Sequence, residues 1–281
     1  KATVYLLELG LGVIVVEVLY FLLRADPDNW WLAAAGFTTG LSVFLTYLAP
    51  VVFLPMFYKS NQLGEGRLRD GLVGLMSTAG FKADQVYEVN VSAKTRTAQA
   101  ALAGLGSSRG IYLSDTLREG YTDREIKAVV AHELGHHVHK HVLKQTALQL
   151  LLIFAGLGFT HLMLHWSAVA LGFDVREVSG LPVLAGTMGL FLIVASPLSN
   201  GYSRILEREA DAYASAATGD PDSLRRALKK IGEQNLAVFD PHPVLEFVFY
   251  SHPPIARRLK QLAVLGRGSD GSKRARSEVV A

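Results

Sequence analysis

The sequence predicts a mainly α-helical, polytopic membrane protein that also contains a polar domain with a small β-sheet. Half of the 281 residues are hydrophobic and the mean hydropathy is +0.25, which is too apolar for an ordinary soluble domain. Buried core helices in a large soluble protein are the alternative, but they would require a very large polar shell. Four apolar stretches are each near the roughly 20 residues that a membrane-crossing helix needs: 3–23, 30–58, 147–172 and 181–198.

Composition excludes several classes of partner and site. The formal net charge is only +3 and no basic stripe alternates with aromatic residues, so we expect no nucleic-acid partner. The chain has no cysteine, so any metal would be bound by histidine and carboxylate groups. The chain begins at Lys1 rather than at Met, so we expect natural N-terminal residues, and with them further helices, to be missing.

The apolar stretches divide the chain into parts. Residues 1–58 are predicted to form two transmembrane helices, and residues 145–200 two more. Neither short connecting loop is enriched in Lys or Arg, and basic residues gather on the opposite side: Lys59, Lys140, Lys144, Arg204 and Arg208. The positive-inside rule therefore places the polar parts in the cytoplasm.

The first polar part, 59–144, combines helical and strand patterns. Residues 66–79 have helical spacing of apolar positions, and residues 86–91, 97–103 and 110–113 are predicted strands, with turns at 80–84 and 104–108. Thr122 and Glu125 match a capping box, so a helix begins there. Its only helix-breaking residue is Gly135, which leaves room for the helix to continue into the third apolar stretch.

The second polar part, 201–265, is predicted to be helical. Residues 202–217 and 223–235 read as helices separated by a stop at 218–221, and a loop at 240–243 follows. The remaining residues, 266–281, are polar, charged and rich in Gly and Ser, so we expect a disordered tail.

The central chemical signal is His132-Glu133-Leu-Gly-His136. Positions four apart on a helix point nearly the same way, so both imidazoles can reach one metal ion. Catalytic zinc sites use three protein ligands and a water molecule, and Glu133 is placed to take a proton from that water. The alternative is an ordinary polar helix face that happens to contain two histidines.

The third ligand must come from elsewhere in the chain. Glu207 and Asp211 share one helix face, so Glu207 could complete the ligand set. Asp211, one turn later, could accept a hydrogen bond from a ligand imidazole and fix its tautomer. Glu209 points about 200° away and is predicted to be solvated or paired. Taken alone, Glu207 would be interpreted as a surface charge.

The other histidines are weaker candidates. We expect His139 and His141 to be solvated or at the membrane interface. His161 and His165 are also four apart, but no acid is beside them in the sequence, so a second metal site there is a minor alternative. His252 precedes two prolines and is a candidate donor to a substrate or an oxyanion, although alone it would be interpreted as a loop histidine.

These motifs together resemble a known family. His132 to His136, Glu207 to Asp211, and Ser251-His-Pro-Pro254 with Arg258 are similar to the integral-membrane zinc proteases of the CaaX prenyl protease type, which include a bacterial heat-shock branch, HtpX. The similarity covers nearly the whole chain, and the segments that resemble the CaaX branch are 49–57, the hairpin 92–106, 111–117 and 131–141.

The resemblance implies a zincin-like metalloprotease domain beside a helical membrane barrel or bundle, with one Zn²⁺ per chain. Glu207 would be the third ligand, and His252 and Arg258 would line the site. The strand 97–103 would pair with an extended substrate. The family usually has Asn-Ala in that strand, whereas this chain has Gln99-Ala100, one methylene longer.

The sequence thus predicts a zinc-dependent membrane endopeptidase of the CaaX-processing type. In this hypothesis Glu133 takes a proton from the metal-activated water and returns it to the leaving amine, while zinc and His252 stabilise the oxyanion. Expected partners are a peptide or protein substrate, with a prenylated C-terminus as one candidate, and the lipid bilayer. The composition favours a bacterial inner membrane over the endoplasmic reticulum.

Three alternatives remain open at this point. Membrane-protein quality control competes with CaaX processing within the protease interpretation. A membrane di-iron oxygenase is superficially compatible with two His-rich segments, 132–137 and 161–165, although nine histidines are few for that class. A non-catalytic membrane scaffold would leave Glu133 without a purpose.

Overall fold

The structure is a computed structural model that describes residues 2–47, 58, 60–81, 85–103 and 110–280. It divides into two compact units. The first, here called the helical unit, contains Lys1–Thr46 and Thr146–Ser199. The second, here called the mixed unit, contains Tyr47–Gln145 and Asn200–Ala281. Residues 82–84 of the predicted turn 80–84, the predicted turn 104–108, and residues 48–57 of the second apolar stretch lie outside the described residues.

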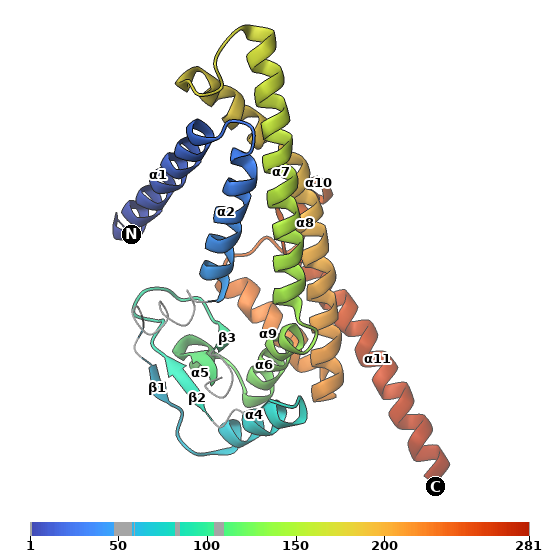
Figure 1. Cartoon of the computed structure of the whole chain (residues 1–281). Helices are drawn as coiled ribbons and strands as arrows, with labels where there is room; N and C mark the ends of the chain where they lie inside the picture. The colour runs from blue at the N-terminus through green and yellow to red at the C-terminus, as the bar shows by residue number, and fades with distance from the viewer. Residues whose placement is uncertain (1, 48–57, 59, 82–84, 104–109, 281) are drawn as a thin grey trace. The chain divides into compact units, whose positions relative to one another are not determined.

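The helical unit consists of long apolar helices (Figure 1). These are α1 (Ala2–Ala25), α2 (Trp30–Tyr47), most of α7 (His141–Leu171), the short 3₁₀ helix η2 (Val178–Gly180) and the first half of α8 (Leu181–Thr218). Its buried core is formed by Leu23, Trp30, Ala34, Ala35, Leu157 and Leu164. Asp26 accepts backbone hydrogen bonds from Asp28 and Asn29 and so shapes the tight connection between α1 and α2.

Two helices of the described residues are long and apolar enough to cross a membrane: His141–Leu171, and Val178–Thr218. Only 22% and 11% of their most apolar windows are buried. A core helix of a soluble protein would be mostly buried, so this exposure favours lipid as the solvent of both helices.

The helix α8 is longer than the sequence predicted. A membrane span and a separate helix at 202–217 were expected, but the structure has one helix of 38 residues with Pro197 in its interior. It ends at Thr218, as predicted, and Gly219 has a positive φ of 61°. Glycine adopts that left-handed conformation without steric cost, and this explains the stop.

The mixed unit contains a four-stranded sheet with the order β1-β2-β4-β3. The strands are β1 (Ser60–Gln62), β2 (Val86–Val89), β3 (Ala100–Ala103) and β4 (Gly110–Ser114). β2 and β4 are parallel, and the other two pairs are antiparallel. The sequence predicted three of these strands and missed β1, because its three exposed polar residues carry no strand pattern. β3 is an edge strand, which leaves one side of its backbone unpaired within the sheet.

Three helices pack against this sheet (Figure 1): α4 (Arg67–Thr78), α5 (Asp115–Gly120) and α6 (Asp123–Val138). Leu68, Leu72 and Met76 lie four apart on α4 and are buried, which is the spacing of one helix face. They share a core with Ile111, Leu113, Leu117, Ile126, Val130 and Leu134. This core holds α6 rigidly, and α6 carries the central motif.

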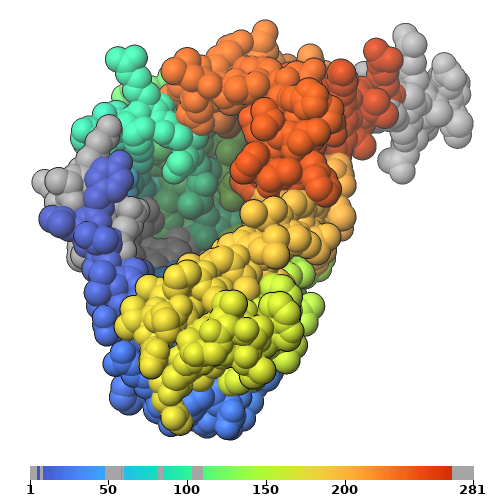
Figure 2. All heavy atoms as spheres, turned by 90° about the horizontal axis from the view of Figure 1, so that it is seen from above, coloured from blue at the N-terminus to red at the C-terminus, as the bar shows by residue number. Residues whose placement is uncertain are grey.

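The C-terminal helices are α9 (Pro221–Gln234), α10 (Pro243–Phe249) and α11 (Ile255–Val280). α9 packs against α11 through Leu224, Leu228 and Leu262, and the two helices belong to the orange-to-red surface in Figure 2. α11 remains helical to Val280, where the sequence predicted a disordered tail from residue 266.

The helix α6 begins and ends at well-defined positions. The predicted capping box is present: Thr122 accepts from the Glu125 backbone, and the Glu125 carboxylate accepts from the Thr122 backbone. The helix does not continue into α7. Lys140 has a φ of 56°, in the left-handed region, and a new helix begins at His141. A continuous helix was therefore the wrong expectation, and the break changes where His141 lies.

The capping box gives a direct test of how α6 is held. Thr122→Ala removes one hydrogen bond to the first turn and is expected to cost about 1 kcal/mol of stability. For a chain of this size that corresponds to a fall of about 2–4 °C in the melting temperature of the purified protein. Thr122→Ser keeps the hydroxyl and is the matched control. Equal melting temperatures for the Ala and Ser variants would contradict the capping role.

Candidate active site

The helix α6 places His132 and His136 side by side. Their Nε2 atoms are 3.2 Å apart, and the two rings meet edge to face. Buried neighbours on the rest of α6, among them Ile126, Val130 and Leu134, fix the rotation of the helix about its axis. Both imidazoles therefore point the same way, as their spacing predicted.

Glu207 on α8 faces the two histidines. Its Oε2 is 3.4 Å from His132 Nε2, and its Oε1 is 3.4 Å from His136 Nε2. One ligand atom from each of the three residues falls within 4.8 Å of the others, and this is the only such group of three among the described residues. Glu207 Oε2 is buried without a hydrogen-bond partner. His132 Nε2 and Arg258 Nη1 approach this oxygen at 3.4 Å and 3.5 Å, so its charge is partly compensated while it keeps a lone pair that a bound cation could use.

Close packing of α6 on α8 brings these residues together. A Cβ atom at Gly135 would lie 3.0 Å from Ala210 Cα and 3.2 Å from Tyr213 Cβ. Gly135 lies between the two histidines on α6, and Ala210 follows Glu207 by about one turn on α8. The missing side chain of Gly135 therefore sets the distance between the two sides of the metal site.

Asp211 and Arg258 stand behind His132. Asp211 is fully buried, and its Oδ1 is 2.9 Å from His132 Nδ1. Arg258 from α11 donates to both Asp211 oxygens, at 2.8 Å and 2.6 Å, and its Nη1 is 3.5 Å from Glu207 Oε2. This bidentate pair compensates the buried charge of Asp211 and fixes the carboxylate that orients the His132 ring.

Burial and nearby charges shift the pKa values of His132 and Glu133 on α6. Burial alone would lower the pKa of His132, but the nearby carboxylates of Asp211 and Glu207 outweigh burial and raise the pKa to about 9. Burial raises the pKa of the Glu133 carboxyl, against the opposing effect of His132 and His136. A carboxyl with a raised pKa accepts protons more readily, which suits a general base near neutral pH.

His252 approaches Glu207 from the loop before α11. Its Nε2 is 3.3 Å from Glu207 Oε1, and its Nδ1 is 3.0 Å from the Ser251 hydroxyl. Pro253 and Pro254 are buried and anchor this loop, whereas the His252 side chain is 65% exposed. His252 thus lies at the open side of the site. Its suggested role as an oxyanion donor stays a prediction.

A cavity of about 400 Å³ opens beside the candidate metal ligands. Its lining includes His132, His136, Glu207, His252, Arg258, Glu133, Ala98, Gln99 and Ala100. Gln99 donates its backbone N–H to the Ser114 hydroxyl, and its carbonyl accepts from the Ser114 backbone. Backbone groups alternate along an antiparallel pair, so those of Ala98 and Ala100 point away from β4. The open edge of the sheet therefore borders the cavity that contains Glu133.

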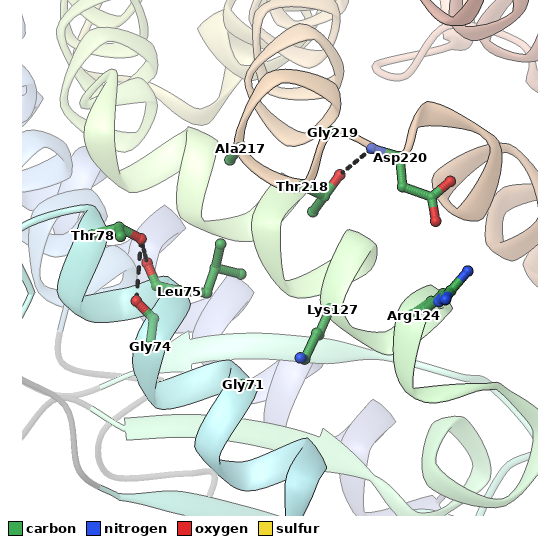
Figure 3. A pocket seen from close by; sticks show the side chains of 10 residues that line it. All are labelled: Gly71, Gly74, Leu75, Thr78, Arg124, Lys127, Ala217, Thr218, Gly219 and Asp220. Atoms are coloured by element: carbon green, nitrogen blue, oxygen red, sulfur yellow. Dashed lines mark hydrogen bonds between the residues drawn. The ribbon is translucent and has the colours of Figure 1, made fainter. Parts of the chain in front are cut away.

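A larger cavity of about 670 Å³ has no comparable chemistry (Figure 3). Gly71 and Gly74 of α4 form one side, and Arg124 and Lys127 of α6 another. Its carboxylate, Asp220, caps α9 by accepting from Ser223. No histidine is among its lining residues, so the smaller cavity is the candidate site.

His141 is buried in the protein, so the expectation that it would be solvated is wrong. His141 is 2% exposed rather than solvated, and its Nδ1 is 2.9 Å from His136 Nδ1. Its Nε2 is 3.0 Å from Glu209 Oε2, so Glu209 is paired, as one of its two predicted states. A spacing of five residues does not place two side chains on one helix face, so only the break at Lys140 reveals this contact. His139 is exposed, as expected.

His161 and His165 lie together in the helical unit, with ring centroids 4.3 Å apart. Asp28 Oδ1 lies 3.9 Å from His165 Nε2. These residues do not form a metal-binding group of three in the described part of the chain. The alternative of a second metal centre there gains no support.

Comparison with known proteins identifies the family. The model of peptidase family M48 matches residues 62–265, which include every residue of the site described above. The chain belongs to peptidase family M48. This confirms the predicted relationship and leaves the di-iron and scaffold alternatives without support.

Relatives of the M48 chain are found in bacteria and eukaryotes. It is 32% identical to the uncharacterized metalloprotease YhfN of Bacillus subtilis, over 87% of this chain and 59% of the relative. It is 30% identical to the probable CAAX prenyl protease 1 of Schizosaccharomyces pombe, over 91% of this chain and 55% of the relative. The M48 chain thus spans less than two thirds of the length of these relatives.

The crystal structure of S. mikatae Ste24p has the same fold. It superposes with a TM-score of 0.78 over 93% of the M48 chain and 67% of the Ste24p chain, at 22% sequence identity. This confirms the predicted architecture of membrane-length helices combined with a small sheet.

The contact at Gly135 gives a test of the site geometry. Gly135→Ala is expected to push α8 away from α6, because the contacted atoms belong to the backbone and to a Cβ rather than to a flexible side-chain end. Displacements near 1 Å can cost about 100-fold in rate, so we expect a loss of roughly 10- to 100-fold in peptide cleavage together with weaker zinc retention. Gly74→Ala on α4 meets open space and is the matched control. Unchanged zinc binding in Gly135→Ala would contradict this interpretation.

Proposed function

We propose that this chain is the catalytic part of a zinc-dependent membrane endopeptidase. The observation that carries the proposal is the convergence of His132, His136 and Glu207 on one point, with a buried Glu207 oxygen that has no donor. Two imidazole nitrogens and one carboxylate oxygen are a known ligand set of catalytic zinc, with a fourth position left for water. We expect one Zn²⁺ per chain.

Zinc, when bound, would polarise the substrate carbonyl and lower the pKa of water to about 7. Glu133 would take the proton from the attacking water and return it to the leaving amine. Burial raises the pKa of its carboxyl, and no hydrogen bond or ion pair to this carboxylate is found among the described residues, so it is free to exchange a proton. His252 lies at the exposed side of the cavity and is the candidate donor to the developing oxyanion.

The open edge of β3 would bind the substrate. Ala98 and Ala100 direct backbone groups away from β4 and line the same cavity as Glu133. An extended peptide could add to this edge as a further strand, so its backbone would be recognised irrespective of side chains. Gln99 also lines the cavity, and its amide is one methylene longer than the Asn of the family pattern.

The substrate class proposed first is a CaaX-type C-terminus, prenylated or not. The relatives named as CAAX prenyl proteases support this proposal. Recognition through the backbone of β3 would equally suit removal of damaged membrane proteins, which is the second candidate. We further propose an integral protein of the bacterial inner membrane, with the mixed unit in the cytoplasm, because the basic residues gather at that unit.

Glu133→Gln separates metal binding from chemistry. The variant keeps the size and the hydrogen-bonding capacity of residue 133 but cannot accept the proton. We expect about one zinc per chain, as in the wild type, and a fall of roughly 10²- to 10⁴-fold in kcat. Metal analysis and a fluorogenic peptide assay measure the two properties. Substantial cleavage by the variant would refute the role of Glu133.

Metal removal tests the cofactor itself. Chelation of the wild type should abolish peptide cleavage, and added Zn²⁺ should restore it. Activity that survives complete removal of the metal would refute the zinc mechanism.

Ala100→Pro tests the substrate strand. It removes an outward N–H without removing a hydrogen bond to β4, so about 1 kcal/mol of peptide binding is lost and KM rises roughly five-fold. Ala101→Pro is the matched comparison, because it would remove a hydrogen bond within the sheet and destabilise the fold. If KM for Ala100→Pro equals that of the wild type, the substrate does not pair with this edge.

A panel of peptides distinguishes the two candidate substrate classes. Matched peptides with a farnesylated, an unmodified or a blocked C-terminal Cys-a-a-X sequence would be compared by kcat/KM. A clear preference for the two peptides with a free Cys-a-a-X terminus over the blocked peptide supports CaaX processing, and the ratio between these two reports whether the farnesyl group is required. Equal rates on all three peptides favour quality control.

A further inference from the structure

We infer that His141, backed by Glu209, is a positioning residue that orients the His136 imidazole toward the metal. The inference rests on the zinc site proposed above and extends it to two residues outside the ligand set. His141 belongs to the first turn of α7, whereas His136 belongs to the last turn of α6.

The contact is short and shielded from water. His141 Nδ1 lies 2.9 Å from His136 Nδ1, and the two rings are nearly perpendicular at 79°. On its other side, His141 Nε2 lies 3.0 Å from Glu209 Oε2. Because His141 is buried, water cannot replace either partner, and both ring nitrogens depend on the protein for hydrogen bonds.

The directions of these hydrogen bonds follow from the metal site. His136 turns Nε2 toward His132 and Glu207, so this nitrogen must keep its lone pair in order to bind a metal. The proton of a neutral His136 is then on Nδ1 and is donated to His141 Nδ1. His141 must accept there, so its own proton is on Nε2 and is donated to the Glu209 carboxylate. This single arrangement of protons satisfies both hydrogen bonds in the series His136–His141–Glu209.

The backbone is shaped to make this contact. In a continuous helix His141 would lie about 140° around the axis from His136, because five residues turn the helix by about 500°. The left-handed Lys140, with φ 56°, ends α6 and starts α7, and so brings His141 back toward His136. A lysine in this conformation is strained, and such strain persists only where the surrounding structure holds it in place.

The two histidine ligands are thus supported differently. His132 donates directly to Asp211, which Arg258 clamps from the other side. The Nδ1 atom of His136 is linked to a carboxylate, that of Glu209, only through His141. The Glu209 side chain is partly exposed, and its Oε2 is also 3.6 Å from Lys144 Nζ. The orientation of His136 therefore depends on one buried neutral ring.

Three substitutions at His141 separate positioning from general packing. The side-chain oxygen of His141→Asn falls near the former Nδ1 and can still accept from His136. The amide of His141→Gln falls near the former Nε2 and reaches Glu209 instead. His141→Ala loses both contacts. We expect zinc affinity to fall by about 10- to 100-fold in the Ala and Gln variants, and the Asn variant to recover most of the loss.

The readouts need no substrate. Zinc affinity is measured by competition with a chromogenic chelator, and the visible absorption of the Co²⁺-substituted protein reports the ligand geometry. Lys140→Gly is the control, since it relieves the positive φ but keeps His141, and it should bind zinc as the wild type does. Melting temperatures of the metal-free variants show whether each one folds.

The outcomes are distinguishable. The inference is supported if His141→Asn binds zinc nearly as tightly as the wild type while His141→Gln and His141→Ala bind it more weakly. Wild-type affinity in Ala, or equal losses in Asn and Ala, overturns it. A wild-type protein that binds no zinc would instead refute the proposed function, independently of His141.

Discussion

The site depends on the close contact between α6 and α8 at Gly135. Two of the candidate metal ligands are on one helix and the third is on the other, so the distance between the helix axes determines whether the three can share one ion. Glycine at this position lets the backbones of the two helices approach closely. A Cβ atom added to Gly135 would lie only 3.0 Å from Ala210 Cα. The apolar core beneath α6 and the capping box at its start keep that helix from shifting.

Around this contact the protein balances buried charge. Glu207 and Asp211 are carboxylates on one face of α8, and both would be costly to bury alone. Arg258 forms ion pairs with both carboxylates, and His252 is a further ion-pair partner of Glu207. One Glu207 oxygen is still left without a hydrogen-bond donor. The site could therefore take one more positive charge, which is what the proposed metal ion would supply.

The neighbours of the ligands come from separate parts of the chain. Asp211 lies on the same helix as Glu207, Arg258 comes from α11, and His141 follows a break in the backbone. Asp211 contacts His132, Arg258 donates to Asp211, and His141 contacts His136, and such contacts outside a metal site tune its affinity and the orientation of its ligands. The edge strand β3 adds the last requirement, an unpaired backbone next to the cavity.

The sequence by itself determined the parts that depend on local periodicity. It determined the apolar helices, the capping box at Thr122, the pair His132 and His136, and the shared face of Glu207 and Asp211, because helical spacing alone fixes which residues point the same way. Strand β1 and the uninterrupted α8 lacked such a signal. Only the tertiary structure decided that His141 is buried against His136 and paired with Glu209. That contact depends on one left-handed residue and on the approach of α8, and neither leaves a periodic trace in the sequence.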